Sequence, residues 1–251
     1  MRATSTNPYP SLLEDGARRR AVAGAGWRCE VPMQLEVWSD VVCPWCYIGK
    51  RRLEAALQRF DGADEVRLRW RSFELDPSAP PVREGSVTEH LATKYGIDRS
   101  GAERMQEQMT AVAAEEGLAY RFGEARLGRS FDAHRLLHLA ADRGCQSALK
   151  ERLMAAAFTE GAAIGEASTL AQLAGEVGLD AGEVDEVLGG SAYADAVRAD
   201  ESDAARLGIT AVPTFVVERS VGVAGAQPAE VLASLLERGR ELIATEERRG
   251  A

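Results

Sequence analysis

Cysteine, histidine and aromatic residues are scarce in this chain of 251 residues, which has 4 cysteines, 3 histidines and an aromatic fraction of 6%. No apolar run approaches the roughly 20 residues that a membrane-spanning helix needs, so we expect no membrane span. Acidic residues outnumber basic ones by 39 to 30. The resulting net charge of −9 argues against nucleic-acid binding, which needs clustered positive charge. The hydrophobic fraction of 45% is that of an ordinary globular protein.

The few cysteines also exclude two structural uses of thiols. Four cysteines in a chain of this length do not form a disulfide-stapled secreted scaffold. A zinc site needs a second pair of ligands, and none is present: Cys29 and Cys145 stand alone, and His90, His134 and His138 have no metal-ligand spacing with them. We therefore expect no metal, interpret the thiols as catalytic, and expect a reducing compartment, the cytoplasm.

Two cysteines, Cys43 and Cys46, are separated by Pro44 and Trp45 and lie where a predicted strand turns into a predicted helix. At a helix N-terminus, free N–H groups and the positive end of the dipole stabilise a thiolate on the first cysteine. Pro44 suits the first helical position, where its missing N–H has no partner in any case. Cys46 falls inside the first turn, near enough to close a small disulfide ring. The pattern is typical of a redox dithiol, and we expect the turn to expose the first thiol.

The segments around this pair predict a β-α-β unit. We expect a strand over Gln34–Ser39, a helix over Pro44–Phe60 and a second strand over Val66–Ser72, where apolar residues and arginines alternate. Two strands joined through a helix are normally parallel, so the cysteine pair lies at the first crossover of a parallel pair.

The remainder of the chain predicts a long helical block followed by a β-β-α end. The end comprises a strand that begins at Pro213, a strand over Val221–Gly225, a helix opened by Pro228, and a solvated tail over 246–251. The helical block between 86 and 207 has seven expected helices: one from Ser86, in a capping box, towards Tyr95, then Ser100–Glu116, Asp132–Asp142, Gln146–Glu160, Ser168–Val177 with Ser168 as N-cap, Asp180–Leu188 and Tyr193–Leu207.

This order of elements, together with Cys43-Pro44-Trp45-Cys46 and the late Val212-Pro213-Thr214, resembles the thioredoxin superfamily, specifically its DsbA family. The match is closer still to FrnE-like cytoplasmic members; further matching stretches are 38–52, 71–77, 133–136 and 225–228. The resemblance implies an α/β, thioredoxin-like fold (β-α-β, then β-β-α) over 33–85 and 208–245. An inserted all-helical domain would cover 86–207. Residues 1–32, which lack periodicity, are expected to form a disordered extension.

Site residues also follow from the resemblance. It implies that Cys43 is the attacking cysteine and Cys46 the resolving one. Pro213 corresponds to the family's cis-proline, and Val212 before it would present its backbone to a bound substrate; an ordinary trans proline at a strand start is the alternative. Strongly oxidising relatives carry a histidine between the cysteines, whereas this chain has Pro44-Trp45, so we expect a less oxidising couple. Trp45 offers either an apolar surface for substrate or packing alone.

Other polar residues give weaker signals. Asp40 ends the first strand and is either a proton relay or a turn-forming residue. Glu74 and Asp76 follow the second strand at the same end of the sheet, where sites of open α/β sheets gather. His134 lies on an amphipathic helix, where a lone histidine usually packs, and Cys145 is expected to be incidental.

Three functions remain to be compared. The first is a thiol–disulfide oxidoreductase acting on protein or small-molecule thiols and disulfides, without a cofactor and with glutathione as a redox partner at most. The second is a glutathione-dependent isomerase or transferase of the 2-hydroxychromene-2-carboxylate isomerase or kappa type, whose members generally hold serine at the first cysteine position. The third is a binding module without catalysis. The intact pair of Cys43 and Cys46 favours the first. The natural substrate, the direction of exchange and the choice between monomer and homodimer stay open.

Overall fold

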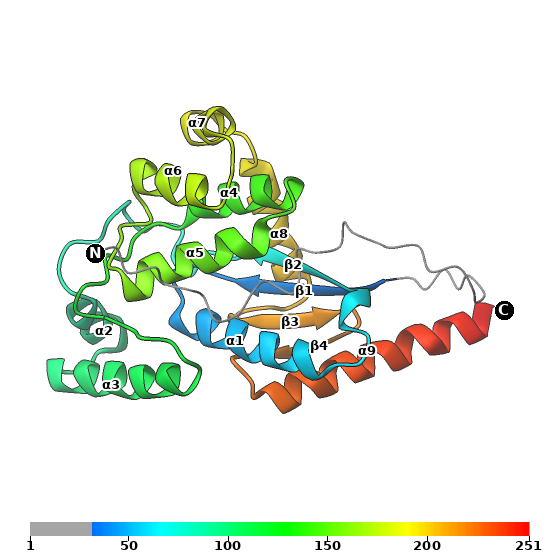
Figure 1. The fold of residues 1–251 in the computed structure, drawn as a ribbon. Coiled ribbons are helices and arrows are strands. Elements are labelled where there is room, and N and C mark those ends of the chain that lie inside the picture. Colours follow the sequence, from blue (N-terminus) through cyan, green and yellow to red (C-terminus); the bar gives the residue numbers. More distant parts are fainter. Residues whose placement is uncertain (1–31, 251) are drawn as a thin grey trace, which may run out of the picture.

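The computed structural model describes residues 32–250, except for the side chains of residues 246, 247 and 250. The disordered extension expected over residues 1–32 therefore lies outside the described part, apart from its last residue, and so does Cys29. The structure has the mixed α/β architecture expected from the sequence, with a four-stranded sheet at its centre (Figure 1).

The sheet has the strand order β2-β1-β3-β4, and the strands are β1 (Met33–Ser39), β2 (Val66–Ser72), β3 (Thr214–Val217) and β4 (Val221–Ala224). β1 and β2 pair in parallel, as the crossover through α1 predicts, whereas β3 is antiparallel to both of its neighbours. β1, near the start of the described residues, and β3, after the helical block, thus lie side by side at the middle of the sheet.

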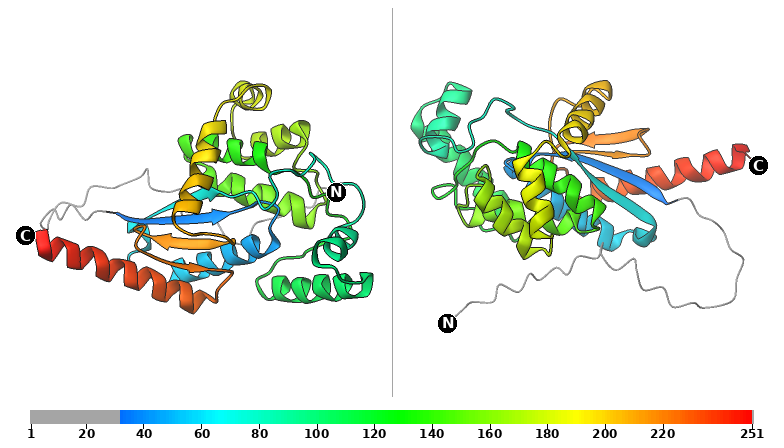
Figure 2. Two further views of the ribbon diagram at one scale, coloured as in Figure 1. Left: turned by 180° about the vertical axis from the view of Figure 1, so that it is seen from behind. Right: turned by 90° about the horizontal axis from the view of Figure 1, so that it is seen from above.

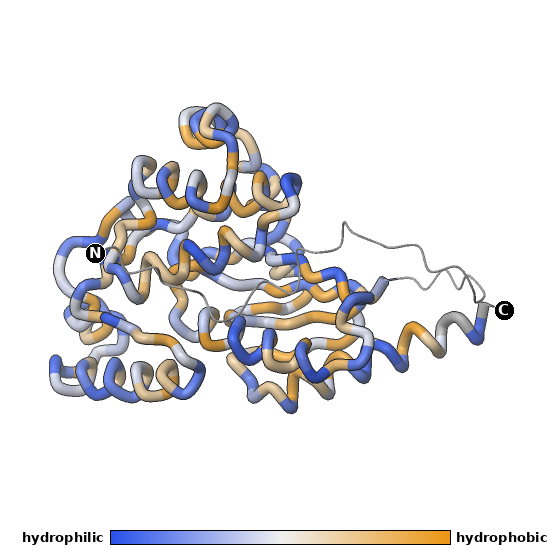
Figure 3. Tube along the Cα trace, viewed as in Figure 1, coloured by the Kyte–Doolittle hydropathy of each residue, from blue (hydrophilic) through white to orange (hydrophobic). Residues whose placement is uncertain are grey.

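One face of the sheet is covered by α1 (Pro44–Arg59) and α9 (Ala229–Gly250) (Figure 1). Leu35 and Val37 of β1 point to this side, and they pack with Leu53 of α1 and Leu232 of α9 in one apolar cluster. Figure 3 shows hydrophobic residues on the central strands and alternating hydrophobic and hydrophilic residues along α9. The helix continues to Gly250 through most of the tail expected over 246–251, because glutamate and arginine favour helix and no breaker interrupts them; Arg248 and Arg249 are exposed, as the expected solvation requires.

The opposite face is covered by α8 (Ala194–Arg206), where Trp38 packs against Ala204 and Val216. The indole N–H of Trp38 donates to the carbonyl oxygen of Asp200 at 2.9 Å. The buried ring therefore has apolar neighbours for its carbon atoms and a hydrogen-bond acceptor for its N–H. Successive residues of β1 therefore face α1 and α9 on one side and α8 on the other, as the two-residue period of a strand requires.

The remaining helices form the block between β2 and α8, and a short 3₁₀ turn (Ala63–Glu65) precedes β2. They are α2 (Val87–Tyr95), α3 (Arg99–Glu115), α4 (Phe131–Asp142), α5 (Gln146–Thr159), α6 (Ala167–Glu176) and α7 (Ala181–Gly189). The helix bounds are within one residue of those expected, and the capping box at Ser86 is confirmed. The expected N-cap at Ser168 is wrong: α6 begins two residues earlier in the chain, after Glu166. Figure 2 shows α9 extending away from this block.

The apolar core of the helical block is continuous with the cysteine pair. Cys43, Cys46 and Tyr47 belong to the same buried cluster as Leu136 of α4 and Leu153 of α5. The start of α1 is thus enclosed by the inserted helices, whereas its second half packs on the sheet and α9. This arrangement allows side chains from the helical block to reach the thiols.

Candidate active site at the start of helix α1

The two cysteines lie at the start of α1 as the sequence predicts. Cys43 is the N-cap residue with an extended backbone (φ −95°, ψ 113°), and Pro44 follows at the first helical position. The N–H of Cys43 donates to the carbonyl oxygen of Asp40 at 3.2 Å, and that of Cys46 donates to the carbonyl oxygen of Cys43 at 3.0 Å. Both thiols are free. The tight turn therefore places the two cysteines one helical turn apart, with the first thiol at the positive end of the helix dipole.

The expectation that the turn exposes the first thiol is wrong, because Cys43 is only 4% exposed. A loop from the far end of the chain lies against it: the Cys43 thiol donates to the carbonyl oxygen of Val212, with 3.7 Å between sulfur and oxygen. Val212 is 169 residues away in the sequence, so the local strand–turn–helix pattern carries no sign of this cover.

The covering loop enters β3 through Pro213, and the Val212–Pro213 peptide bond is cis. Its close approach to α1 depends on Gly49. A Cβ atom at Gly49 would lie 2.8 Å from Cγ of Pro213 and 3.3 Å from the ring of Phe215, so a larger residue would push the loop away from the helix. Gly49 is a site residue that the sequence reasoning did not single out.

Comparison with known proteins agrees with this geometry. The family model described as a DSBA-like thioredoxin domain matches residues 34–237. The chain belongs to the DsbA-like thioredoxin family. The protein YwbO of Bacillus subtilis, whose function is uncharacterised, is 30% identical over 202 residues, which cover 77% of this chain and 92% of YwbO.

Solved structures share this fold. A probable DsbA oxidoreductase from Streptomyces coelicolor is 45% identical, with a TM-score of 0.80 over 83% of this chain and 90% of that one. A 2-hydroxychromene-2-carboxylate isomerase is 16% identical, with a TM-score of 0.61 over 85% of this chain and 98% of that one. The second likeness concerns the fold alone.

Behind the cysteine turn lies a buried carboxylate, Asp40, which is held on several sides. One of its oxygens accepts from the N–H of Val42 at 3.3 Å and lies 3.4 Å from Nε2 of His134, and the other accepts from the N–H of Leu75 at 2.8 Å. Burial alone would raise the pKa of Asp40, but His134, the Leu75 N–H and the hydroxyl of Ser130 outweigh it and lower the pKa. Asp40 is thus both a turn-forming residue and the anchor of the loop after β2, and His134 is buried beside it.

The two carboxylates expected near the site do not reach the cysteines. Glu74 is buried and pairs with Arg198 of α8 at 2.7 Å, while burial and nearby Glu201 raise its pKa. Asp76 binds Ser78 and Arg83, which lower its pKa to about 2. The loop after β2 contributes to the site through the backbone of Leu75 instead.

The side chains between and beside the cysteines differ in exposure. Trp45 is 41% exposed although it adjoins two buried thiols, and Leu75 is equally exposed. Behind the pair, the hydroxyl of Tyr120 donates to the carbonyl oxygen of Pro44 at 2.7 Å, which ties the first turn of α1 to the helical block. The site therefore has an apolar outer surface at Trp45 and a polar inner wall.

The inner wall includes a lysine that the sequence reasoning missed. Lys150 of α5 is completely buried, and its ammonium donates to the carbonyl oxygen of Ser39 at 3.3 Å. In contrast, the next residue, Glu151, binds Lys50 at 2.7 Å, Arg51, and the hydroxyl of Tyr47 at 2.6 Å. Two neighbours on α5 thus contact α1 and β1 in different ways.

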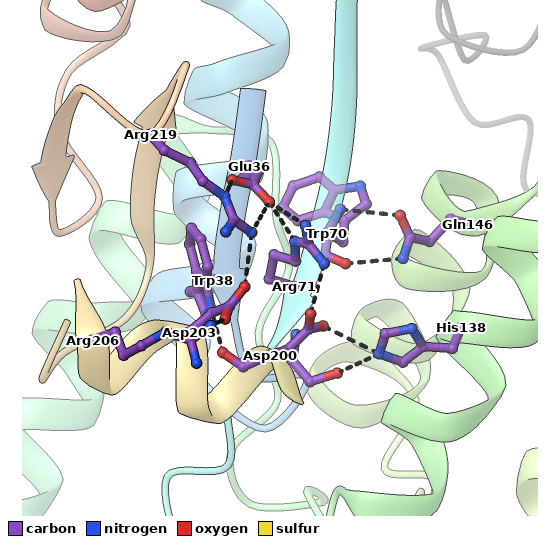
Figure 4. Close-up of polar contacts among 11 residues, drawn as sticks. Glu36, Trp38, Trp70, Arg71, His138, Gln146, Asp200, Asp203, Arg206 and Arg219 are labelled. Atoms are coloured by element: carbon purple, nitrogen blue, oxygen red, sulfur yellow. Dashed lines mark hydrogen bonds and ion pairs between the residues drawn. The ribbon is translucent and has the colours of Figure 1, made fainter. Parts of the chain in front are cut away.

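A second polar cluster, drawn in Figure 4, joins β1 and β2 to α8 and α4 away from the cysteines. Arg71 pairs with Glu36 and, at 2.8 Å, with Asp200, whose other oxygen accepts from the N–H of Ser72 and lies 3.1 Å from Nε2 of His138. Burial would raise the pKa of Asp200, but these partners lower it. Each charged group named here has a hydrogen-bond or ion-pair partner, so the cluster fastens α8 to the sheet. No group of acidic, histidine and cysteine residues suited to a metal occurs within residues 32–250.

Proposed function

We propose that this protein is a thiol–disulfide oxidoreductase that exchanges disulfides through Cys43 and Cys46. The observation that carries the proposal is the pair of free thiols one turn apart at the N-terminus of α1, in a chain of the DsbA-like family. In the reductive direction, the Cys43 thiolate attacks a substrate disulfide, releases one substrate thiol and forms a mixed disulfide. Cys46 then attacks the sulfur of Cys43, releases the second substrate thiol and leaves a Cys43–Cys46 disulfide. Oxidation of a substrate is the reverse.

Substrate binding is assigned to the residues around the thiols. The cis Val212–Pro213 loop lies against Cys43, and the backbone of Val212 is positioned to pair with an extended substrate segment next to the reacting sulfur. Pro44 and exposed Trp45 provide an apolar surface on the outer side. Because Cys43 is nearly covered, a substrate has to displace the contact between its thiol and the carbonyl of Val212.

The alternative, a glutathione-dependent isomerase, is supported by a likeness of fold alone. An isomerase needs one activated group and gains nothing from a resolving thiol, which would convert that group into an inactive disulfide. We assign glutathione the role of a redox partner that forms and reduces disulfides with Cys43, and no bound cofactor takes part.

No helix within residues 32–250 has both the length and the apolar character to cross a membrane.

Single-cysteine variants test this proposal. Cys43→Ser is expected to abolish insulin-disulfide reduction, whereas Cys46→Ser is expected to accumulate a mixed disulfide on Cys43, visible by mass spectrometry. Cys145→Ser, which removes the remaining thiol of the described part, is the control and should retain wild-type reduction.

The same samples distinguish the alternative. Wild-type protein that fails to reduce insulin, together with a Cys46→Ala variant that isomerises 2-hydroxychromene-2-carboxylate at full rate, would overturn the oxidoreductase assignment. An adduct on Cys46 instead of Cys43 would reverse the roles of the two thiols.

A further inference from the structure

Lys150 is a buried cation without a carboxylate partner. Its side chain has no exposed surface, and among residues 32–250 its ammonium forms no ion pair. Its polar contacts are the carbonyl oxygen of Ser39 at 3.3 Å and the ring face of Trp70, whose centroid is 5.7 Å away. A cation removed from water needs compensation, and one carbonyl and one ring compensate it only in part. Burial accordingly lowers the pKa of Lys150 to about 8, which still leaves it mainly protonated at neutral pH.

Lys150 lies beneath the cysteine turn. Its ammonium binds the carbonyl oxygen of Ser39, the next residue is Asp40, whose carbonyl accepts from the N–H of Cys43, and the carbonyl of Cys43 accepts from the N–H of Cys46. Negative charge on Cys46 would raise the pKa of Lys150 most, followed by that on Asp40 and Cys43. The positive charge of Lys50 on α1 lowers it. Asp40 already accepts hydrogen bonds from Val42 and Leu75 and contacts His134. Cys46 lies in the same buried wall, and the cation that favours its charged form is Lys150.

Cys46 needs such a partner because its surroundings oppose its ionisation. It is 1% exposed, and burial raises the pKa of its thiol well above the usual value, with a further increase from neighbouring Cys43. The charge of Lys150 and the backbone at Asp40 act in the opposite direction. A resolving cysteine has to become a thiolate before it can attack, so the groups that lower the pKa of Cys46 favour the resolving step.

We propose that Lys150, supplied by the inserted helices, is the counter-ion of the Cys46 thiolate in the step that resolves the mixed disulfide. This inference rests on the function proposed above. In that step the Cys46 thiol loses its proton to solvent, the thiolate attacks Sγ of Cys43, and the Cys43–Cys46 disulfide forms. The sulfur of the substrate leaves with the electron pair of the broken bond and takes up a proton. Lys150 keeps its own proton throughout and stabilises the negative charge on Cys46.

A quenched-flow experiment separates the two chemical steps. Reduced protein is mixed with glutathione disulfide, quenched in acid, and analysed by mass spectrometry, which gives one rate for the adduct on Cys43 and another for its conversion into the Cys43–Cys46 disulfide. Lys150→Met keeps the length of the side chain and removes the charge. We expect it to slow resolution about tenfold, with the pH profile of resolution displaced upward by about one unit, and to change the first attack by less than about threefold.

Lys50→Met is the matched control, because Lys50 is also a buried lysine but is paired with Glu54 and Glu151. Both of its rates should stay within about threefold of wild type. Lys150→Gln, a second neutral variant, should behave as Lys150→Met.

The outcomes distinguish this inference from the function on which it rests. If wild-type protein forms no adduct on Cys43 and no Cys43–Cys46 disulfide, the proposed function fails. If wild type completes both steps and the two neutral variants resolve at the wild-type rate, the role of Lys150 is overturned while the function stands. Equal slowing of attack and resolution would also overturn it, because a merely structural role affects both steps alike.

Discussion

Lys150 and Glu151 are neighbours on α5, and both face the start of the cysteine helix, yet their environments are opposite. Glu151 is bound by two cations and a tyrosine hydroxyl, whereas Lys150 contacts a carbonyl oxygen and a ring face. Burial would raise the pKa of Glu151, but Lys50 and Arg51 outweigh it and lower the pKa to about 2. Complete pairing suits a contact that fastens the helical block to α1. Incomplete pairing suits a place where charge appears only during a reaction.

The largest expected effect on stability comes from removing the charge of Glu151, the fully paired residue. Glu151→Gln removes the acid that binds both Lys50 and Arg51, so we expect a loss of about 3 kcal/mol of unfolding free energy at pH 7, measured by urea denaturation. The folded pKa of Glu151 is depressed, so its contribution is present above its ordinary pKa of 4.5 and is lost as the pH falls towards about 2. The variant should lack this loss. Unchanged stability at pH 7 would show that the contact does not fasten the block.

Removing the unpaired charge of Lys150 should raise the free energy of unfolding instead of lowering it. Lys150→Met removes a buried charge, so the oxidised protein, in which neither Cys43 nor Cys46 titrates, should gain about 2 kcal/mol at pH 7. Burial holds the folded pKa of Lys150 below its ordinary 10.5, so between the folded and the ordinary value the unfolded state binds more protons and wild-type stability rises with pH.

That rise should be absent in the Lys150→Met variant, as measured by urea denaturation from pH 7 to 9.5. A loss of stability at pH 7 together with an unchanged pH dependence would show that Lys150 acts as an ordinary packing residue.

The smallest effect concerns the other tie between the helical block and α1. Tyr120→Phe removes the hydrogen bond to the carbonyl oxygen of Pro44 and keeps the ring that packs against Phe158. We expect a loss of about 1 kcal/mol in urea denaturation, with insulin reduction lowered by less than about threefold. Tyr95→Phe, at an exposed tyrosine, provides the control and should leave stability unchanged. A loss of reduction as severe as that of Cys43→Ser would assign the Tyr120 hydroxyl a direct part in the exchange.

Local patterns predicted most of the fold. Alternation over β1 and β2 and periodicity over the helices depend on neighbours within a few residues, and the structure has these elements within one or two residues of the expected bounds. The errors also have local causes. The N-cap of α6 is Glu166 and not Ser168, because the preference of serine for N-caps was considered without the path of the preceding loop. α9 is longer than expected because its charged C-terminal residues favour helix.

Lys150 shows why the inner wall of the site could not be predicted in the same way. In the sequence, Lys150 is followed by Glu151 and Arg152, and nothing in this run of charges marks Lys150 as buried. The face that carries Lys150 is instead buried, with Gln146 bound to the backbone of Trp70 on the edge strand and Met154 packed one turn further on. Since α5 is enclosed on several sides, its charged residues do not mark its outer surface.

The sequence by itself determined that the two thiols would stand one turn apart at the beginning of a helix, because strand, turn and helix are all local there. It also determined the parallel β1–β2 pair, since a helical crossover allows little else. Only the tertiary structure decided that Val212 covers Cys43, that Gly49 admits Pro213, and that Lys150 binds the carbonyl of Ser39 beneath the cysteine turn. These contacts join segments more than a hundred residues apart, and such segments meet only when β1 and β3 pair in one sheet and the helical block packs around the start of α1.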